Sequence, residues 1–138
     1  MLNGVRKRLQ IIMNFCNICK FTIVIPFIIS CDGSIKSDLI LSDYCVNLGD
    51  VKEGITISGK VKLFNKGRTD LLIKRIDTDC GCTLATIDKM KIESNDSACI
   101  YYSINTTNKL GNIENFVFIE SNTDSILHFI QLKANVLK

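Results

Sequence analysis

The feature that most constrains the fold is a period-two alternation of apolar and polar residues, which recurs in short segments after Cys31. Such alternation is typical of β-strands that turn one face to a core and the other to water. Polar turn sequences separate the segments, and none of them shows a sustained period of 3.6 residues. The segments expected to form strands are residues 55–64, 71–76, 98–104, 113–120 and 126–136.

This pattern predicts an all-β domain. Several short alternating strands within roughly a hundred residues indicate an antiparallel β-sandwich or a small barrel. A sandwich is favoured, because only one face of most strands is apolar. The chain has 138 residues, which is room for one such domain, and we place it at residues 39–138.

The N-terminal segment has the pattern of an export signal rather than of a folded element. Four basic residues and no acidic residue precede Cys31, and nine mostly apolar residues occupy positions 21–29. That run is too short to span a bilayer, which takes roughly 20 residues. We therefore expect residues 1–30 to be a signal peptide, starting at either Met1 or Met13.

Ile28-Ile29-Ser30-Cys31 resembles the lipobox of bacterial lipoproteins, with isoleucine where leucine is commoner. In that pattern the cysteine thiol receives a diacylglycerol and becomes the new N-terminus after cleavage. We expect a lipidated Cys31, a polar tether over residues 31–38, and an exported domain anchored to the bacterial cell envelope membrane.

The alternative is an uncleaved anchor that runs from about Leu9 onward. It has to place Asn14, Asn17 and Lys20 in hydrocarbon, which is costly. Either arrangement puts the domain on the far side of a membrane.

The charge of the domain argues against a nucleic-acid partner. Four of the 17 basic residues and none of the 14 acidic residues precede Cys31, so the segment after Cys31 has a balance of about −1. Binding to a phosphate backbone requires a basic surface. Envelope proteins and the membrane are the partners that the sequence suggests.

Outside the cytoplasm, disulfide bonds persist. Two of the seven cysteines lie in the expected signal peptide, and Cys31 is the expected lipid site. The remaining four allow three pairings, and the sequence does not choose among them. They are Cys45, Cys80, Cys82 and Cys99.

Cys80 and Cys82 are separated only by Gly81. In an extended strand their Cα atoms lie about 6.6 Å apart, near the upper limit of the roughly 4.4–6.8 Å that a disulfide spans. Gly81 lets the backbone tighten, so that a direct bond is feasible but strained. Strained disulfides are the more easily reduced ones, which suits redox chemistry.

Two other roles remain open for this pair. Its thiolates also suit one soft metal ion, such as Cu(I) or Zn(II), although two cysteines are half of a closed zinc site. A structural role is favoured, in which the pair shapes a bend, packs as small apolar residues, or bonds to Cys45 or Cys99. We expect Cys45 and Cys99 to be buried or paired rather than reactive.

The residues required for catalysis are missing from the sequence. It has one histidine, His128, and neither a nucleophile elbow nor a zinc-protease motif. Gly-rich phosphate loops are absent. We therefore expect no enzyme and no small-molecule substrate, and no cofactor apart from the soft metal considered above. His128 is expected on the core face with a hydrogen-bond partner.

Tyr101 and Phe116 fall on the outward faces of their expected strands. Such residues form a contact patch or, more commonly, fill the second sheet. The sequence leaves both roles open.

From about Leu41 to Val136 the chain resembles the family catalogued as Domain of Unknown Function 1573. The resemblance is carried by a Phe-Asn-Lys-Gly turn, a Leu-Leu-Ile strand, the Asp-Cys-Gly-Cys-Thr motif, and a Ser-Asn turn after a Phe-Val-Phe-Ile strand. These lie at residues 64–67, 71–73, 79–83 and 116–122. One departure is Ser94-Asn95-Asp96, where the family usually has a Pro-Gly type turn.

The resemblance implies an immunoglobulin-like β-sandwich of about seven strands, often carried by bacterial envelope lipoproteins and related to Hydin-like and sperm-protein-like modules. The family carries no established activity. Cys80 and Cys82 match its motif, whereas Cys45 and Cys99 have no assignable counterpart. The expected function is a non-catalytic binding or scaffolding module, and the alternative is a thiol-based metal-binding or redox protein.

Overall fold

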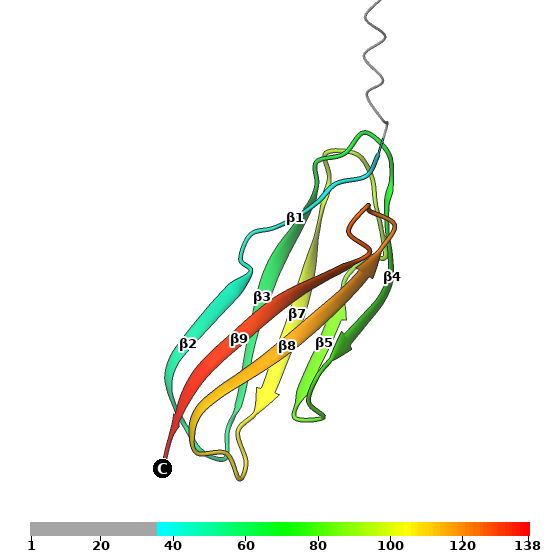
Figure 1. Ribbon diagram of the computed structural model, residues 1–138. Helices are drawn as coiled ribbons and strands as arrows, with labels where there is room; N and C mark the ends of the chain where they lie inside the picture. The colour runs from blue at the N-terminus through cyan, green and yellow to red at the C-terminus, as the bar shows by residue number, and fades with distance from the viewer. Residues whose placement is uncertain (1–35) are drawn as a thin grey trace, which may run out of the picture. The chain divides into compact units, whose positions relative to one another are not determined.

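A computed structural model describes residues 36–138, which form two β-sheets (Figure 1). The expected signal peptide, Cys31 and most of the tether lie outside the described residues. No helix among residues 36–138 is long and apolar enough to span a membrane. The strands are β1 (Leu39–Leu41), β2 (Cys45–Lys52), β3 (Thr56–Asn65), β4 (Leu71–Thr78), β5 (Thr83–Ile87), β6 (Lys91–Ile92), β7 (Ser97–Asn105), β8 (Gly111–Ser121) and β9 (Leu127–Leu137).

The predicted all-β sandwich is confirmed. One sheet has the strand order β1-β3-β7-β5 and the other has the order β2-β9-β8-β4-β6. The five segments expected from the alternation became β3, β4, β7, β8 and β9. The sequence missed the remaining four strands. β1 and β6 are too short to show a period, β2 is interrupted by Gly49 and a register shift, and the five residues of β5 do not alternate strictly.

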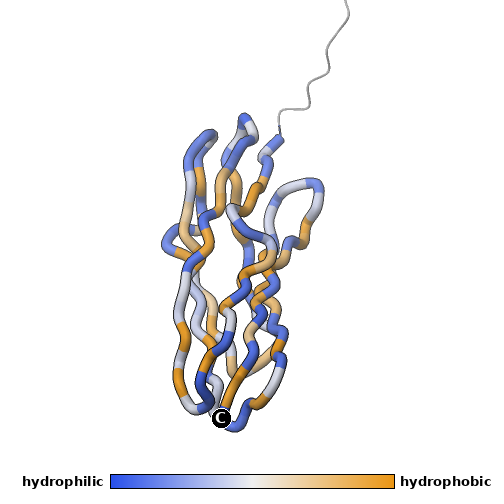
Figure 2. Tube along the Cα trace, turned by 90° about the vertical axis from the view of Figure 1, so that its left-hand side faces the viewer, coloured by the Kyte–Doolittle hydropathy of each residue, from blue (hydrophilic) through white to orange (hydrophobic). Residues whose placement is uncertain are grey.

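The core lies between the two sheets and is made by the inward residues of the alternating strands. Figure 2 shows hydrophobic and hydrophilic residues alternating along the strands. As predicted, Val117 and Ile119 are buried while Phe116 and Phe118 face outward. Ile126 was expected on the core face but is exposed, because β9 begins one residue later. The buried side chains without measurable exposure include Leu63, Leu71, Ile92, Ile100, Val117, Ile119, Ile130 and Leu132.

The N-terminal strands join both sheets. β1 pairs antiparallel with β3, and β2 crosses to the other sheet, where it pairs with β9. The β2–β9 pair is parallel, in contrast to the antiparallel arrangement expected from the sequence, which holds for the other described pairs. The chain therefore enters the sandwich along one edge of each sheet.

The turn at residues 65–67 forms where predicted, but for a different reason. We expected Asn65 and Gly67 to supply positive φ angles, and neither has one. Asn65 instead has a fully buried side chain that binds backbone groups, and Gly67 lies against the backbone of residues 36–38. The turn at residues 94–96 does use a positive φ, which is 62° at Asn95.

Candidate functional site

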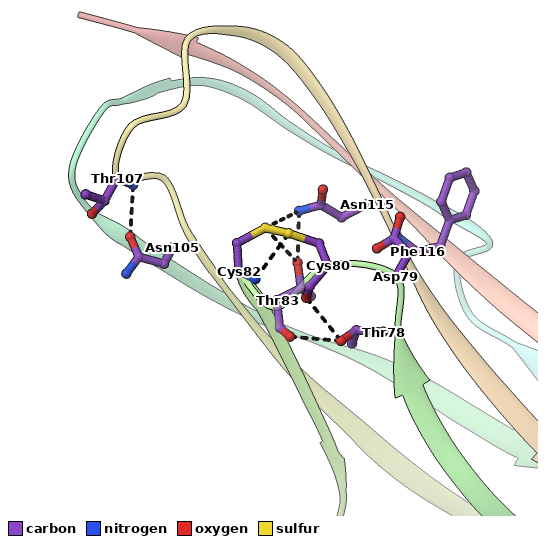
Figure 3. The surroundings of a disulfide bond; sticks show 9 residues. All are labelled: Thr78, Asp79, Cys80, Cys82, Thr83, Asn105, Thr107, Asn115 and Phe116. Atoms are coloured by element: carbon purple, nitrogen blue, oxygen red, sulfur yellow. Dashed lines mark hydrogen bonds between the residues drawn. A yellow bond between two sulfur atoms is a disulfide. The ribbon is translucent and has the colours of Figure 1, made fainter.

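Cys80 and Cys82 are joined by a disulfide in the loop between β4 and β5 (Figure 3). The two Cα atoms lie 5.2 Å apart, closer than in an extended strand, because the chain turns at Gly81. Among the pairings that the sequence left open, the structure contains the direct bond. Both cysteines are half-buried and Gly81 is exposed.

Hydrogen bonds fix the loop to the start of β5. Thr78 donates from Oγ1 to the carbonyl of Thr83 at 3.0 Å and is 3.3 Å from the carbonyl of Cys80. The buried side chain of Asn115, on β8, donates from Nδ2 to Oγ1 of Thr83 at 2.9 Å and lies 3.8 Å from Sγ of Cys82. Two side chains of the five-stranded sheet therefore bind the first residue of β5, which belongs to the four-stranded sheet, and hold the loop in place.

A second connection runs through Asp79. Its Oδ1 accepts a hydrogen bond from the backbone N–H of Phe116 at 2.9 Å, and its own N–H donates to the Phe116 carbonyl at 3.2 Å. The Asp79 carboxylate is thereby directed to the β8 backbone rather than to the two sulfurs.

The geometry bears on the three roles considered for the pair. In the disulfide both sulfurs are bonded to each other, so neither is a thiolate ligand. Residues 36–138 contain no cluster of three or more His, Cys, Asp or Glu side chains placed to hold a metal. Metal binding at Cys80 and Cys82 therefore requires prior reduction and further ligands from elsewhere.

Cys45 and Cys99, the secondary disulfide candidates, are free thiols. Cys45 is exposed and Cys99 is half-buried, so the expectation that they are buried or paired is not met. Alternation places them on the outward faces of β2 and β7, which belong to different sheets. The core separates the two side chains, and a bond between them within one domain is excluded.

His128 lies on the inward side of β9, as predicted, and has the predicted hydrogen-bond partner. Its Nε2 is 2.9 Å from Oγ1 of Thr123. Burial lowers the pKa of His128, against smaller opposing effects from the Ser125 backbone and Asp38. The ring is therefore neutral at pH 7, in keeping with a packing role.

Three phenylalanines form a cluster on the outer face of the five-stranded sheet, which we call the phenylalanine face. The rings of Phe116 and Phe118 are 6.2 Å apart and nearly parallel, and Phe129 meets Phe116 edge-on at 6.0 Å. Phe129 is 52% exposed. Tyr101, by contrast, lies on the outer face of the other sheet and is not part of this cluster.

Sequence reasoning found only part of the phenylalanine face. Phe116 was considered as a contact residue, whereas Phe118 and Phe129 were not. The sequence could have identified Phe118, because the alternation places its side chain on the same outward face as Phe116. Phe129 lies directly opposite Phe118 in the β8–β9 register, which only the structure provides.

Polar side chains border the phenylalanine face along β8, β9 and β2. Glu114 accepts from Nε2 of Gln131 at 3.2 Å and pairs with Lys133 at 3.2 Å. Further along, Nδ2 of Asn135 donates to Oδ1 of Asp50 at 2.9 Å. Glu114 and Gln131 therefore lie next to the three rings, and the Asn135–Asp50 bond lies nearer the C-terminal end of β9.

Comparison with known proteins agrees with the fold. A family model described as protein of unknown function (DUF1573) matches residues 39–136, which confirms the resemblance seen in the sequence. No curated protein matches the chain significantly.

Among solved structures, a protein of unknown function from Porphyromonas gingivalis W83 has a TM-score of 0.65 at 18% identity, covering 72% of this chain and 46% of that protein. The chain thus spans about half the length of that protein. The ASH/PapD-like domain 7 of human CEP192 has a TM-score of 0.57 at 12% identity, covering 75% of this chain and 87% of that domain.

The secreted serine protease VesC from Vibrio cholerae has a TM-score of 0.57 at 16% identity, with 78% of this chain and 24% of the protease covered. At these identities the likeness shows the fold alone. Neither the site nor the comparisons indicate catalysis.

Proposed function

Since this chain belongs to the DUF1573 family of proteins of unknown function, we propose that it is a non-catalytic binding module of the bacterial cell envelope. The domain is exported and anchored to a membrane through a lipid on Cys31. It binds an envelope protein through the phenylalanine face.

The phenylalanine face is the observation that carries this proposal. Fully burying an exposed phenylalanine side chain is favourable by about 1.5–3 kcal/mol. Here three rings share one outward surface, on which Phe129 is 52% exposed and Phe116 and Phe118 are half-buried. Contiguous apolar surface with a polar border marks protein contact sites. Aromatic residues, phenylalanine among them, are also enriched at such sites.

The anchor is tested by replacing Cys31 with serine. We expect the variant to lack the lipid, because serine has no thiol to receive diacylglycerol, and to keep residues 1–30, because cleavage follows lipidation in the lipobox pattern. Intact mass measures both effects, with Cys45→Ser as a control that alters an exposed thiol outside the lipobox. A parent protein whose intact mass contains residues 1–30 and no diacylglycerol would instead support an uncleaved anchor.

The binding face is tested by a photoreactive phenylalanine analogue at position 118 in the full chain, in intact cells. We expect cross-linking to a discrete envelope protein from position 118, where the analogue replaces an outward ring. The same analogue at Lys60, which is exposed on the outer face of the other sheet, is the control. Absence of a product at position 118, or equal products at both positions, would refute the proposed face.

A second function is favoured by the accessible Cys80–Cys82 bond. In this alternative an external dithiol reduces the disulfide: one donor sulfur attacks Cys80 or Cys82, and the other donor sulfur resolves the mixed disulfide. The loop gains two electrons and two protons, and the donor becomes a disulfide. Once reduced, both thiols are available to a soft metal ion.

The stability of the double variant Cys80→Ser/Cys82→Ser separates a structural role from this alternative. The disulfide closes a loop of only about three residues, so we expect a loss of only about 2 kcal/mol. Urea unfolding of a soluble form starting at Asp32 measures it, with Cys45→Ser/Cys99→Ser as the matched control. A loss of more than about 4 kcal/mol would make the disulfide a main structural support.

A further inference from the structure

The four-stranded sheet ends in an unprotected edge at β5. Natural sheets protect their edges by shortness, bulges, proline or charge. β1 and β6 have three and two residues, and β2 has a register shift and charged residues. β5 has the uncharged sequence Thr-Leu-Ala-Thr-Ile and pairs with β7 in unbroken register.

Two hydrogen bonds that flank β5 determine which of its backbone groups face outward. Asn105 donates to the carbonyl of Cys82 at 2.8 Å, and Asp88 donates to the carbonyl of Cys99 at 3.2 Å. In an antiparallel ladder the bonded residues alternate. The N–H and C=O groups of Leu84 and Thr86 therefore face β7, and those of Ala85 and Ile87 face the free edge.

Thr83 also has its backbone turned away from β7, but its groups are already bonded. Its N–H donates to the carbonyl of Cys80 at 3.0 Å, and its carbonyl accepts from Oγ1 of Thr78. The groups at Ala85 and Ile87 remain available, since β5 has no strand other than β7 beside it among residues 36–138.

We propose that this edge pairs with β5 of a second copy of the chain. The two strands run antiparallel about a two-fold axis at Thr86. Ala85 of each copy then exchanges two backbone hydrogen bonds with Ile87 of the other. The dimer therefore has four intermolecular bonds, which use the free N–H and C=O of both residues in both copies. An axis at Ala85 fits less well, because it places Ile87 opposite Thr83 of the second copy, whose groups are occupied.

The side chains agree with this register. Thr86 is exposed and faces Thr86 of the second copy, and such cross-strand threonine pairs are favourable. Leu84 is 69% exposed and lies beside the added strand. Two short strands bury less than the roughly 1,000 Å² of a stable interface, so the dimer is weak and depends on local concentration. The inference does not depend on the lipid anchor or the phenylalanine face.

Cysteine cross-linking tests the register in the full chain, in intact cells, with Cys45→Ser/Cys99→Ser as background. At a non-bonded antiparallel pair the Cα atoms are about 4.5 Å apart, within disulfide range. We therefore expect Thr86→Cys to give a covalent dimer with a mild oxidant. The matched variant Leu84→Cys should give none, because the two copies of position 84 lie about 13 Å apart along the strands.

A proline at Ala85 supplies the second test. It removes an outward N–H and leaves the bonds to β7 intact. Because two of the four intermolecular bonds are lost, we expect at least a tenfold weaker association in the Thr86→Cys background. The proposal would be overturned if the Ala85→Pro variant retained the dimer. It would also be overturned if Thr86→Cys gave no dimer, gave as much dimer as Leu84→Cys, or formed a disulfide with a different protein.

Discussion

Replacing Asn65 with aspartate is expected to lower the free energy of unfolding by about 4 kcal/mol or more. The Asn65 side chain is fully buried. Its Nδ2 donates to the carbonyls of Thr69, Ile92 and Glu93 at 2.8, 3.0 and 3.1 Å. Its Oδ1 accepts from Gly67 at 3.0 Å.

Aspartate has the same shape but no donor. A carboxylate oxygen would replace Nδ2 and face three carbonyl oxygens, so that those carbonyls lose their partner and a charge is buried beside them. Breaking a buried charged or hydrogen-bonded site costs about 3–5 kcal/mol. Domains of this size have only about 5–15 kcal/mol of stability.

Urea unfolding at pH 7 measures the loss, with Asn105→Asp as the matched control. Asn105 is exposed, and its Oδ1 accepts from the N–H of Thr107 at 2.9 Å, which a carboxylate also does. The control is expected to stay within about 0.5 kcal/mol of the parent.

The pH dependence of the Asn65→Asp variant provides a second signature. The buried carboxyl has a raised pKa in the folded state, so the folded protein binds a proton more tightly than the unfolded one. Relative to the parent, the variant therefore gains stability as the pH falls. A variant that unfolds at the parent's urea midpoint at pH 7 would show that the buried network is dispensable.

Asn65 also illustrates the limit of sequence reasoning about the fold. Alternation predicts β3, β7, β8 and β9, because each side chain's direction follows from its parity along one strand. The partners of Asn65 lie in the turn that follows and in the segment around β6. Contacts with residues so far along the chain depend on how the strands pack together. The alternation within one strand does not predict such contacts.

The same limit applies to the candidate sites. The spacing of Cys80 and Cys82 lies at the edge of what a disulfide spans, so the sequence left several roles open. The local turn at Gly81, together with the hydrogen bonds of Thr78 and Asn115, brings the pair within bonding distance. That Cys45 is a free thiol could not be predicted, because it follows from the sheet to which β2 belongs. The sequence of β2 has no clear period from which its place could be predicted.

Gly67→Ala is expected to cost about 3–5 kcal/mol. A Cβ at this position would lie 2.3 Å from the carbonyl oxygen of Lys36 and 2.5 Å from both Cα of Ser37 and N of Asp38. All three are backbone atoms, which do not move aside by changing a side-chain rotamer. Overpacking of this kind costs about 1–3 kcal/mol by itself.

Further cost comes from the bonds that hold this segment. The N–H of Arg68 donates to the Lys36 carbonyl at 3.0 Å, and the N–H of Lys66 donates to the Asp38 carbonyl at 2.9 Å. A displaced segment loses both bonds, at about 1 kcal/mol each. Urea unfolding measures the total, and faster amide exchange at Lys66 and Arg68 locates it.

Gly81→Ala is the matched control, because a Cβ there would meet nothing within 4 Å and its φ is not positive. It should change stability by less than about 0.5 kcal/mol or raise it slightly, since alanine restricts the unfolded chain. If both variants lost the same stability, the loss would come from replacing any glycine rather than from the contacts at Gly67. A loss only at Gly67 attributes it to the close approach of residues 36–38, where the chain enters the sandwich.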